Sequence, residues 1–500
     1  MKRPPKSGHT LAILWLCHAL ATAWLAALIG SSVGMYTHTM GEGVTRFALV
    51  FALWLTGVGA HFAFTQAANK GVAPILPGVP RARWIMAAIA SALFAYHVFA
   101  GVSEIRRTGR LNAIHLDQGQ IVYRAIRLMP DHNPYSRTLL LDPIYYITQI
   151  KRHFDSGCLR FDIPQPAPGA SRAERIEWIG EMIASVKRFW WDLDLTEMRR
   201  LMPNVIPGTY CDDARFGFES LGFKYGPVTL VSYVPTVLLW DKPGVFVTQM
   251  VYFVAICATL LTLGRVRTGQ GRAAALLPLV VALALPHLRE NLLEASALDG
   301  PPTLFSLLAL LLHWQRRPSL SAVSLGLALA CKPLPGLLYL PLLLGTPPRN
   351  LLICLGTAVT PYLGFVVWDA WGVWNNVVLF ALTRGTEATS LAHYLPPAGR
   401  AALTGSCAGL ILLTLVRAYR RGFGRADQIA YLFSAHLGVL AGAPIMRNNY
   451  LVWLSPVLAL QCLELWQACR GSQSGSRTGH PLKAAAAPHD RLDGRTDEPV

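Results

Sequence analysis

Charged side chains are scarce in this chain, and acidic ones are the scarcest. Of its 500 residues, 15% are charged and 53% are hydrophobic, and the mean hydropathy is +0.36. Soluble domains contain about 25% charged residues. The composition therefore excludes an ordinary soluble protein and predicts an all-α membrane protein that crosses the bilayer many times.

Metal-ligand patterns are also absent from the sequence. Its nine cysteines include no Cys-x-x-Cys pair and no His/Cys cluster, so we expect no metal and no other cofactor. Cys158 and Cys211 lie in a long polar loop and could form a disulfide in an oxidising compartment, which the sequence leaves open. No spaced acidic pair lies in a segment predicted to be cytoplasmic, and Asp212-Asp213 is expected at a loop surface.

Basic residues outnumber acidic ones, 45 to 28, for a formal charge of +17. Many of them lie in short segments between apolar runs, as the positive-inside rule expects, so the charge indicates topology and no nucleic-acid partner. It also favours some attraction to anionic lipid. Four such connections, expected in the cytoplasm, are 264–272, 313–318, 346–350 and 417–425.

The apolar runs predict about twelve spans with both termini in the cytoplasm. "MKRPPK" and the run after it indicate an uncleaved first span. The expected spans are 11–31, 46–65, 84–102, 244–264, 273–288, 302–314, 319–331, 335–346, 350–370, 400–416, 427–444 and 450–467. Several are shorter than the roughly 20 residues of a straight crossing. Residues 103–226 then form a large extracytoplasmic loop, and 226–240, interrupted by Pro235, is expected to be a re-entrant or interfacial helix.

Three regions follow from this topology. Residues 1–83 hold an N-terminal pair of spans, 84–467 form the main membrane module, and 468–500 form a polar tail expected to be disordered.

The stretch "HLDQGQIVYRAIRLMPDHNPYS" (115–136) follows the third span. Ile121, Val122, Ala125, Ile126 and Met129 recur at helical spacing, and Asp117 lies four residues before Ile121. The pattern predicts a short helix with a carboxylate on its apolar face, ended by the Asn133-Pro134 turn signal.

The topology places a set of polar side chains on the outer face. They are Asp117, Arg289, Lys332, His393, Tyr394, Arg447, Asn449 and Tyr450. Each has an ordinary structural interpretation: Asp117 as a helix N-cap, Lys332 as a snorkelling side chain, Arg447 as an interface anchor, and His393 as a loop surface residue. Their joint placement at the edge of a helix bundle makes them functional candidates.

Four motifs in order carry a resemblance. They are Asp117 with Tyr123 and "HNPYS", which contains Asn133 and Tyr135; "FKYGPVTLVSYVP" (223–235), which contains Tyr225; "SLGLALACKPLPGLLYLPLLL" (324–344), which contains Lys332; and "NNYLVWLSPVLAL" (448–460). This order, over residues 84–467, resembles the polyprenol-phosphate-dependent glycosyltransferases of the GT-C class, in particular the family 87 mannosyltransferases.

The chain departs from the family pattern at several points. Gly226 replaces the usual first proline of the second motif, and "LDGPPT" (298–303) lacks the usual glutamine, which leaves acceptor or sugar contacts there in doubt. Two additional spans precede the motif set, and the outer loop is larger than expected.

The resemblance implies a GT-C-like bundle with juxtamembrane helices in its extracytoplasmic loop. It implies transfer of a hexose, with mannose the first choice, from a polyprenyl-phosphate donor to a lipid- or glycan-linked acceptor, with inversion, at the outer face of the plasma (inner) membrane. Asp117 would be the general base, and Lys332, Arg447 and Arg289 would meet the donor phosphate. The implied substrate-binding residues are Tyr123, Asn133, Tyr135, Tyr225, His393, Tyr394, Asn449 and Tyr450.

Elementary chemistry agrees with these roles. A sugar hydroxyl is a weak nucleophile, so a nearby carboxylate assists by taking its proton. Partial burial of Asp117 on an apolar face would make it a stronger base. A departing phosphate gains negative charge, which fixed cations stabilise.

Other functions stay open at this point. A transporter or flippase of lipid-linked sugars would use the same cations, with Asp117 as a proton relay, but no inverted repeat is visible. A polymer ligase or polymerase with a lipid-linked donor is a third reading, and a non-enzymatic scaffold leaves the outer polar set unexplained. The sequence does not identify the sugar, the acceptor, the pathway or the oligomeric state.

Overall fold

The computed structural model describes residues 82–107, 117–129, 133–135, 171, 174, 223–269, 273–285, 287–294, 297–379, 390–443 and 450–474. The predicted spans 11–31 and 46–65, both loop cysteines, Asp212-Asp213 and the end of the polar tail lie outside these residues.

The described residues form helices and contain no β-strand, which confirms the all-α class for this part of the chain. In chain order the elements are α3 (Ala82–Arg107), α4 (Asp117–Leu128), α9 (Pro227–Trp240), α10 (Lys242–Thr268), η2 (Ala273–Leu276), α11 (Leu277–Ala284), η3 (Arg289–Glu294), α12 (Gly300–Trp314), α13 (Pro318–Cys331), α14 (Pro333–Tyr339), η4 (Leu340–Leu343), α15 (Pro348–Val373), η5 (Trp374–Leu379), η6 (Leu391–Tyr394), α17 (Pro397–Arg420), α18 (Arg425–Gly442) and α19 (Leu451–Ser474). Eight of the α-helices, from α9 to α17, carry proline in their first turn, where its missing N–H costs no helical hydrogen bond.

Three described helices, α10, α15 and α17, are long and apolar enough to cross a membrane. They overlap the predicted spans 244–264, 350–370 and 400–416. Most other apolar helices have 10 to 17 residues, so the predicted count of about twelve spans is not confirmed. Helix α10 is largely enclosed by the bundle, whereas α15 and α17 expose most of their apolar side chains. These exposed faces indicate a membrane protein, because lipid tails solvate such faces.

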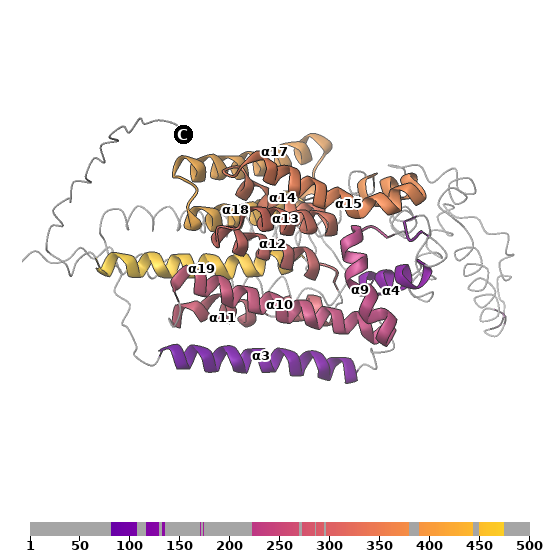
Figure 1. Ribbon diagram of the computed structural model, residues 1–500, viewed down its shortest axis with the longest axis horizontal. Coiled ribbons are helices and arrows are strands. Elements are labelled where there is room, and N and C mark those ends of the chain that lie inside the picture. The colour runs from indigo at the N-terminus through magenta and orange to yellow at the C-terminus, as the bar shows by residue number, and fades with distance from the viewer. Residues whose placement is uncertain are drawn as a thin grey trace, which may run out of the picture.

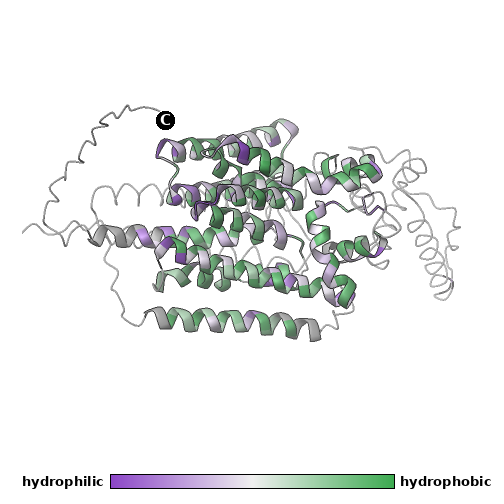
Figure 2. Cartoon of the chain, viewed as in Figure 1, coloured by the Kyte–Doolittle hydropathy of each residue, from purple (hydrophilic) through white to green (hydrophobic). Residues whose placement is uncertain are grey.

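Most helices lie side by side along the long axis of the molecule (Figure 1). Hydrophobic residues make up much of these helices (Figure 2). The buried core joins α10, α12, α13, α18 and α19 through residues such as Phe253, Leu310, Leu325, Phe433 and Val457. Helix packing in a membrane depends on close van der Waals contact of this kind.

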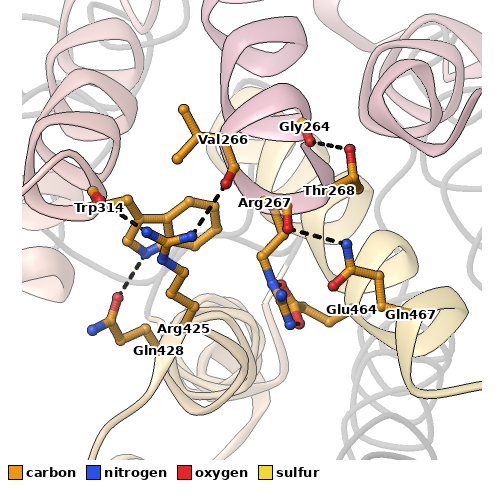
Figure 3. Close-up of polar contacts among 9 residues, drawn as sticks. All are labelled: Gly264, Val266, Arg267, Thr268, Trp314, Arg425, Gln428, Glu464 and Gln467. Carbon is orange, nitrogen blue, oxygen red and sulfur yellow. Dashed lines mark hydrogen bonds and ion pairs between the residues drawn. The ribbon is translucent and has the colours of Figure 1, made fainter. Parts of the chain in front are cut away.

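The four basic connections predicted to share one side do meet at one end of the bundle, here called the basic end. The Arg425 guanidinium donates to the Val266 and Trp314 carbonyls at 3.2 and 2.9 Å (Figure 3). The Tyr419 hydroxyl donates to the Pro341 carbonyl at 2.6 Å, and Ser319 donates to Asn350 at 3.1 Å. The four connections therefore lie together at this end of the helix bundle.

At the opposite end, called the site end, α9 runs across the bundle rather than along it (Figure 1). The chain turns at Asp241, whose φ of 56° lies in the left-handed region, and then enters α10. The segment 226–240 is thus helical as predicted, and its orientation differs from that of the long helices.

Candidate functional site

The site end is organised around Lys332, which lies between α13 and α14. Pro333 follows it, and a residue before proline avoids the helical region. Lys332 is accordingly extended, with φ −158° and ψ 114°, and the helix breaks there. Its Nζ lies 2.7 Å from Oδ1 of Asp299, the residue before α12. The Asp299 side chain is completely buried, while that of Lys332 keeps 20% of its surface exposed.

Three aromatic rings surround the Lys332 ammonium. Its Nζ lies 4.6 Å from the ring centroid of Trp453, 5.2 Å from that of Tyr450 and 5.5 Å from that of Tyr225. Each distance permits a cation–π interaction. Trp453 also donates its indole N–H to Oδ1 of Asp299 at 2.9 Å. We call Asp299, Tyr225, Tyr450 and Trp453 the Lys332 cage.

Gly226 allows α9 to begin directly against the end of α13. Its N–H donates to the Cys331 carbonyl at 2.8 Å, and Thr229 donates to the same oxygen at 3.3 Å. A Cβ at position 226 would lie only 1.7 Å from the Ala330 carbonyl oxygen. The glycine that departs from the family pattern is therefore required here, since it places Tyr225 beside Lys332.

The predicted turn at Asn133-Pro134 packs next to Tyr225 and helps to hold it in place. The Tyr135 hydroxyl donates to the Tyr225 carbonyl at 2.9 Å, and Asn133 donates to the Phe365 carbonyl of α15 at 3.2 Å. Asn376 of η5 donates to the Tyr135 carbonyl at 2.6 Å. Asn133 and Tyr135 are both buried. Both were predicted to bind substrate; in the structure Tyr135 holds the Tyr225 backbone, and Asn133 fastens the turn to α15.

Helix α4 forms as its apolar spacing predicted. Ile121, Val122, Ala125 and Ile126 are buried, and the helix packs on α9. Asp117 is its first residue, at the N-terminus; the orientation of its side chain lies outside the description.

Tyr123, also predicted to bind substrate, donates its hydroxyl to Asp241 at 2.7 Å at the start of α10. That hydrogen bond is the main reason that the pKa of Asp241 lies below its usual value, and Arg127, 3.8 Å away, lowers it further. Tyr123 thus connects α4 to the α9–α10 turn.

The remaining predicted residues are distributed as follows. The Arg289 guanidinium lies 5.5 Å from the Tyr96 ring centroid on α3 and 3.7 Å from Glu290. His393 and Tyr394 stack edge to face in η6, which Ser390 fastens to the Ala443 carbonyl at the end of α18. Tyr450 belongs to the Lys332 cage, and Arg447 and Asn449 lie outside the described residues.

Sequence reasoning missed two members of the cage. Asp299 lies in "LDGPPT" (298–303), which stood out in the sequence only because it lacks a glutamine. Trp453 lies in the motif "NNYLVWLSPVLAL" (448–460). The available signal for Asp299 was a lone acidic residue beside an apolar helix, which is costly unless the carboxylate is paired.

The described residues contain no group of three His, Cys, Asp or Glu side chains placed to hold a metal ion. No family model, no curated protein and no solved structure matches this chain.

Proposed function

We propose that this chain is a membrane glycosyltransferase. It transfers a hexose, with mannose the first choice, from a polyprenyl-phosphate donor to a lipid- or glycan-linked acceptor, with inversion at the anomeric carbon. The observation that carries the proposal is the Lys332 ammonium, fixed by Asp299 and three aromatic rings at one end of a helix bundle, on a side chain that keeps 20% of its surface exposed.

Lys332 is the proposed contact for the donor phosphate. An ammonium group has three donors, and Asp299 occupies one of them here. As the bond between the anomeric carbon and the phosphate oxygen breaks, the phosphate keeps the electron pair and gains charge. A cation that is already positioned stabilises this charge without reorganising. The Lys332 side chain keeps 20% of its surface exposed, which is compatible with that contact.

Asp117 is the proposed general base. The acceptor hydroxyl oxygen attacks the anomeric carbon while its proton passes to the carboxylate. Support comes from the packing of α4, which Asp117 begins: its buried face lies on α9, and α9 begins next to Tyr225 of the Lys332 cage. Asp117 and Lys332 thus belong to elements that share the site end.

The test uses the full chain in liposomes with a radiolabelled mannosyl polyprenyl phosphate and a mixed lipid acceptor. Asp117→Asn should lower transfer by about 10²–10⁴-fold, the usual contribution of a general base. Asp427→Asn, at the basic end, is the matched control and should keep its activity. Undiminished transfer by Asp117→Asn would contradict the proposed base. Movement of the donor lipid between leaflets without any transfer by the wild type would instead identify a flippase.

A further inference from the structure

The basic end presents a set of arginines that the proposed function does not use. Seven of them come from four connections, and we call them the arginine rim: Arg265, Arg316, Arg317, Arg349, Arg417, Arg420 and Arg421. All are exposed residues, although the Arg421 side chain keeps only 27% of its surface exposed.

Few carboxylates accompany the rim in the described part of the basic end. Among the described residues of the basic end, the acidic side chains are Asp427 and Glu464. Glu464 accepts two hydrogen bonds from Arg267, at 2.5 and 2.7 Å, and is buried (Figure 3). Asp427 lies 3.9 Å from Arg421. The described part of the basic end therefore carries a large excess of positive charge. The electric field of these charges attracts anions.

Exposed apolar side chains adjoin the rim directly. Leu351 and Leu352 follow Arg349 on α15, and Leu352 is 70% exposed. Leu412, Leu413 and Val416 precede Arg417 on α17 and are 40–62% exposed. A partner that fits both features has an anionic group joined to apolar chains. This combination favours a phospholipid over a nucleic acid or an acidic peptide.

The length of α15 agrees with a lipid partner. Arg349 and Trp368 lie near its two ends, separated by 19 residues and so by about 28 Å along the helix axis. The hydrocarbon core of a bilayer is about 30 Å thick. Trp368, Trp371 and Trp374 are about half exposed at the far end, and tryptophan prefers the interface. Arg349 then lies at the depth of the opposite headgroups.

We propose that the arginine rim binds acidic phospholipid headgroups of the leaflet that the basic end faces. The planar guanidinium donates two parallel hydrogen bonds to a phosphate, and arginine is the only basic residue type in the rim. The inference is independent of the proposed glycosyl transfer.

The test is native mass spectrometry of the detergent-solubilised full chain, titrated with phosphatidylglycerol or with phosphatidylcholine. The variant is Arg316→Gln/Arg317→Gln/Arg349→Gln, since these three side chains form no ion pair within the described part of the chain. Lysine at the same three positions is the charge-conserving control, and Arg400→Gln, at the site end, is the positional control.

The wild type should retain phosphatidylglycerol in preference to phosphatidylcholine. The glutamine variant should lose about fivefold in phosphatidylglycerol affinity per arginine, and the lysine variant should keep most of it. The wild-type preference should also shrink as salt rises from about 0.05 to about 0.5 M. Equal retention of both lipids by the wild type, or an unchanged preference in the glutamine variant, would overturn the proposal.

Discussion

The Lys332 ammonium and the Asp299 carboxylate lie 2.7 Å apart, although 33 residues separate them in the chain. Trp453 donates to the same carboxylate oxygen, so one buried group joins α12, the α13–α14 break and α19. A carboxylate without exposed surface is stable only when it is paired and hydrogen-bonded. Lys332 therefore stabilises the fold in addition to its proposed contact with phosphate, and experiments on it must separate these two roles.

A double-variant cycle makes that separation. Lys332→Met removes the cation that lies 2.7 Å from the buried Asp299 carboxylate and should lower the free energy of unfolding by about 3 kcal/mol. Adding Asp299→Asn removes the buried carboxylate charge and should restore part of this loss, while donor use stays impaired. The measurements are chemical unfolding in detergent and the donor KM.

Lys242→Met is the matched control, because it removes a cation at the same end without touching Asp299. If the stabilised double variant also regained wild-type donor use, Lys332 would have only its structural duty. A donor KM unchanged in both Lys332 variants would lead to the same conclusion.

The close approach at Gly226 gives a second prediction. In Gly226→Ala the new Cβ would meet the Ala330 carbonyl, so α9 must shift, and the protein should lose about 3 kcal/mol of stability. Gly356→Ala, within α15, has open space around its Cβ and should gain about 0.5–1 kcal/mol from helix propensity. Thermal unfolding of both variants measures the difference. A Gly226→Ala variant as stable as the wild type would contradict the tight contact between α9 and α13.

Local sequence pattern was sufficient for the elements that depend on local physics. The spacing of Ile121, Val122, Ala125 and Ile126 predicted α4, and the Lys332-Pro333 pair marked a helix break at the correct residue. The four basic connections also lie at one end of the bundle, which fits the expectation that their charges keep them together. The predicted count of about twelve spans is not confirmed, because most other described apolar helices have 10 to 17 residues.

Side-chain partners were beyond the sequence, because tertiary packing selects them. Nothing in the chain indicates that Asp299 pairs with Lys332, or that Trp453 donates to it from 154 residues away. Asn133 and Tyr135 were predicted to bind substrate from their motif; packing buries both and directs them toward backbone carbonyls, which the motif alone does not indicate. The residue types and the order of the motifs in the chain identified the region of the candidate site. Tertiary packing decides which residues of those motifs face Lys332.

The contact between Tyr123 and Asp241 predicts a pH-dependent attachment of α4. A carboxyl whose pKa is lowered on folding contributes stability above its unfolded pKa, and this contribution is lost as the pH falls through the folded pKa. Attachment should be complete at neutral pH and weaken below about pH 4. Tyr123→Phe should raise the pKa of Asp241 and speed hydrogen exchange in α4 at about pH 7, with a smaller difference from the wild type at about pH 3.

The same variant tests the alternative role of Tyr123. If transfer falls while exchange in α4 stays at the wild-type rate, Tyr123 contacts substrate rather than holding α4. Arg127→Gln is a useful companion, because Arg127 is 3.8 Å from Asp241, is exposed, and should have the smaller effect.

At the basic end, the Arg267–Glu464 pair should be the strongest single link between α10 and α19. Two parallel hydrogen bonds join the side chains, and Gln467 adds one to the Arg267 carbonyl (Figure 3). Arg267→Ala would leave the buried Glu464 charge unpaired and should cost about 3 kcal/mol. Arg267→Ala/Glu464→Ala should lower the free energy of unfolding by less than the sum of its single variants, with a coupling energy of about 1–3 kcal/mol.

The control is Arg421→Ala, whose partner Asp427 is 3.9 Å away and partly exposed. It should change the free energy of unfolding by less than about 1 kcal/mol. Equal losses from Arg267→Ala and Arg421→Ala would show that the buried geometry confers no advantage.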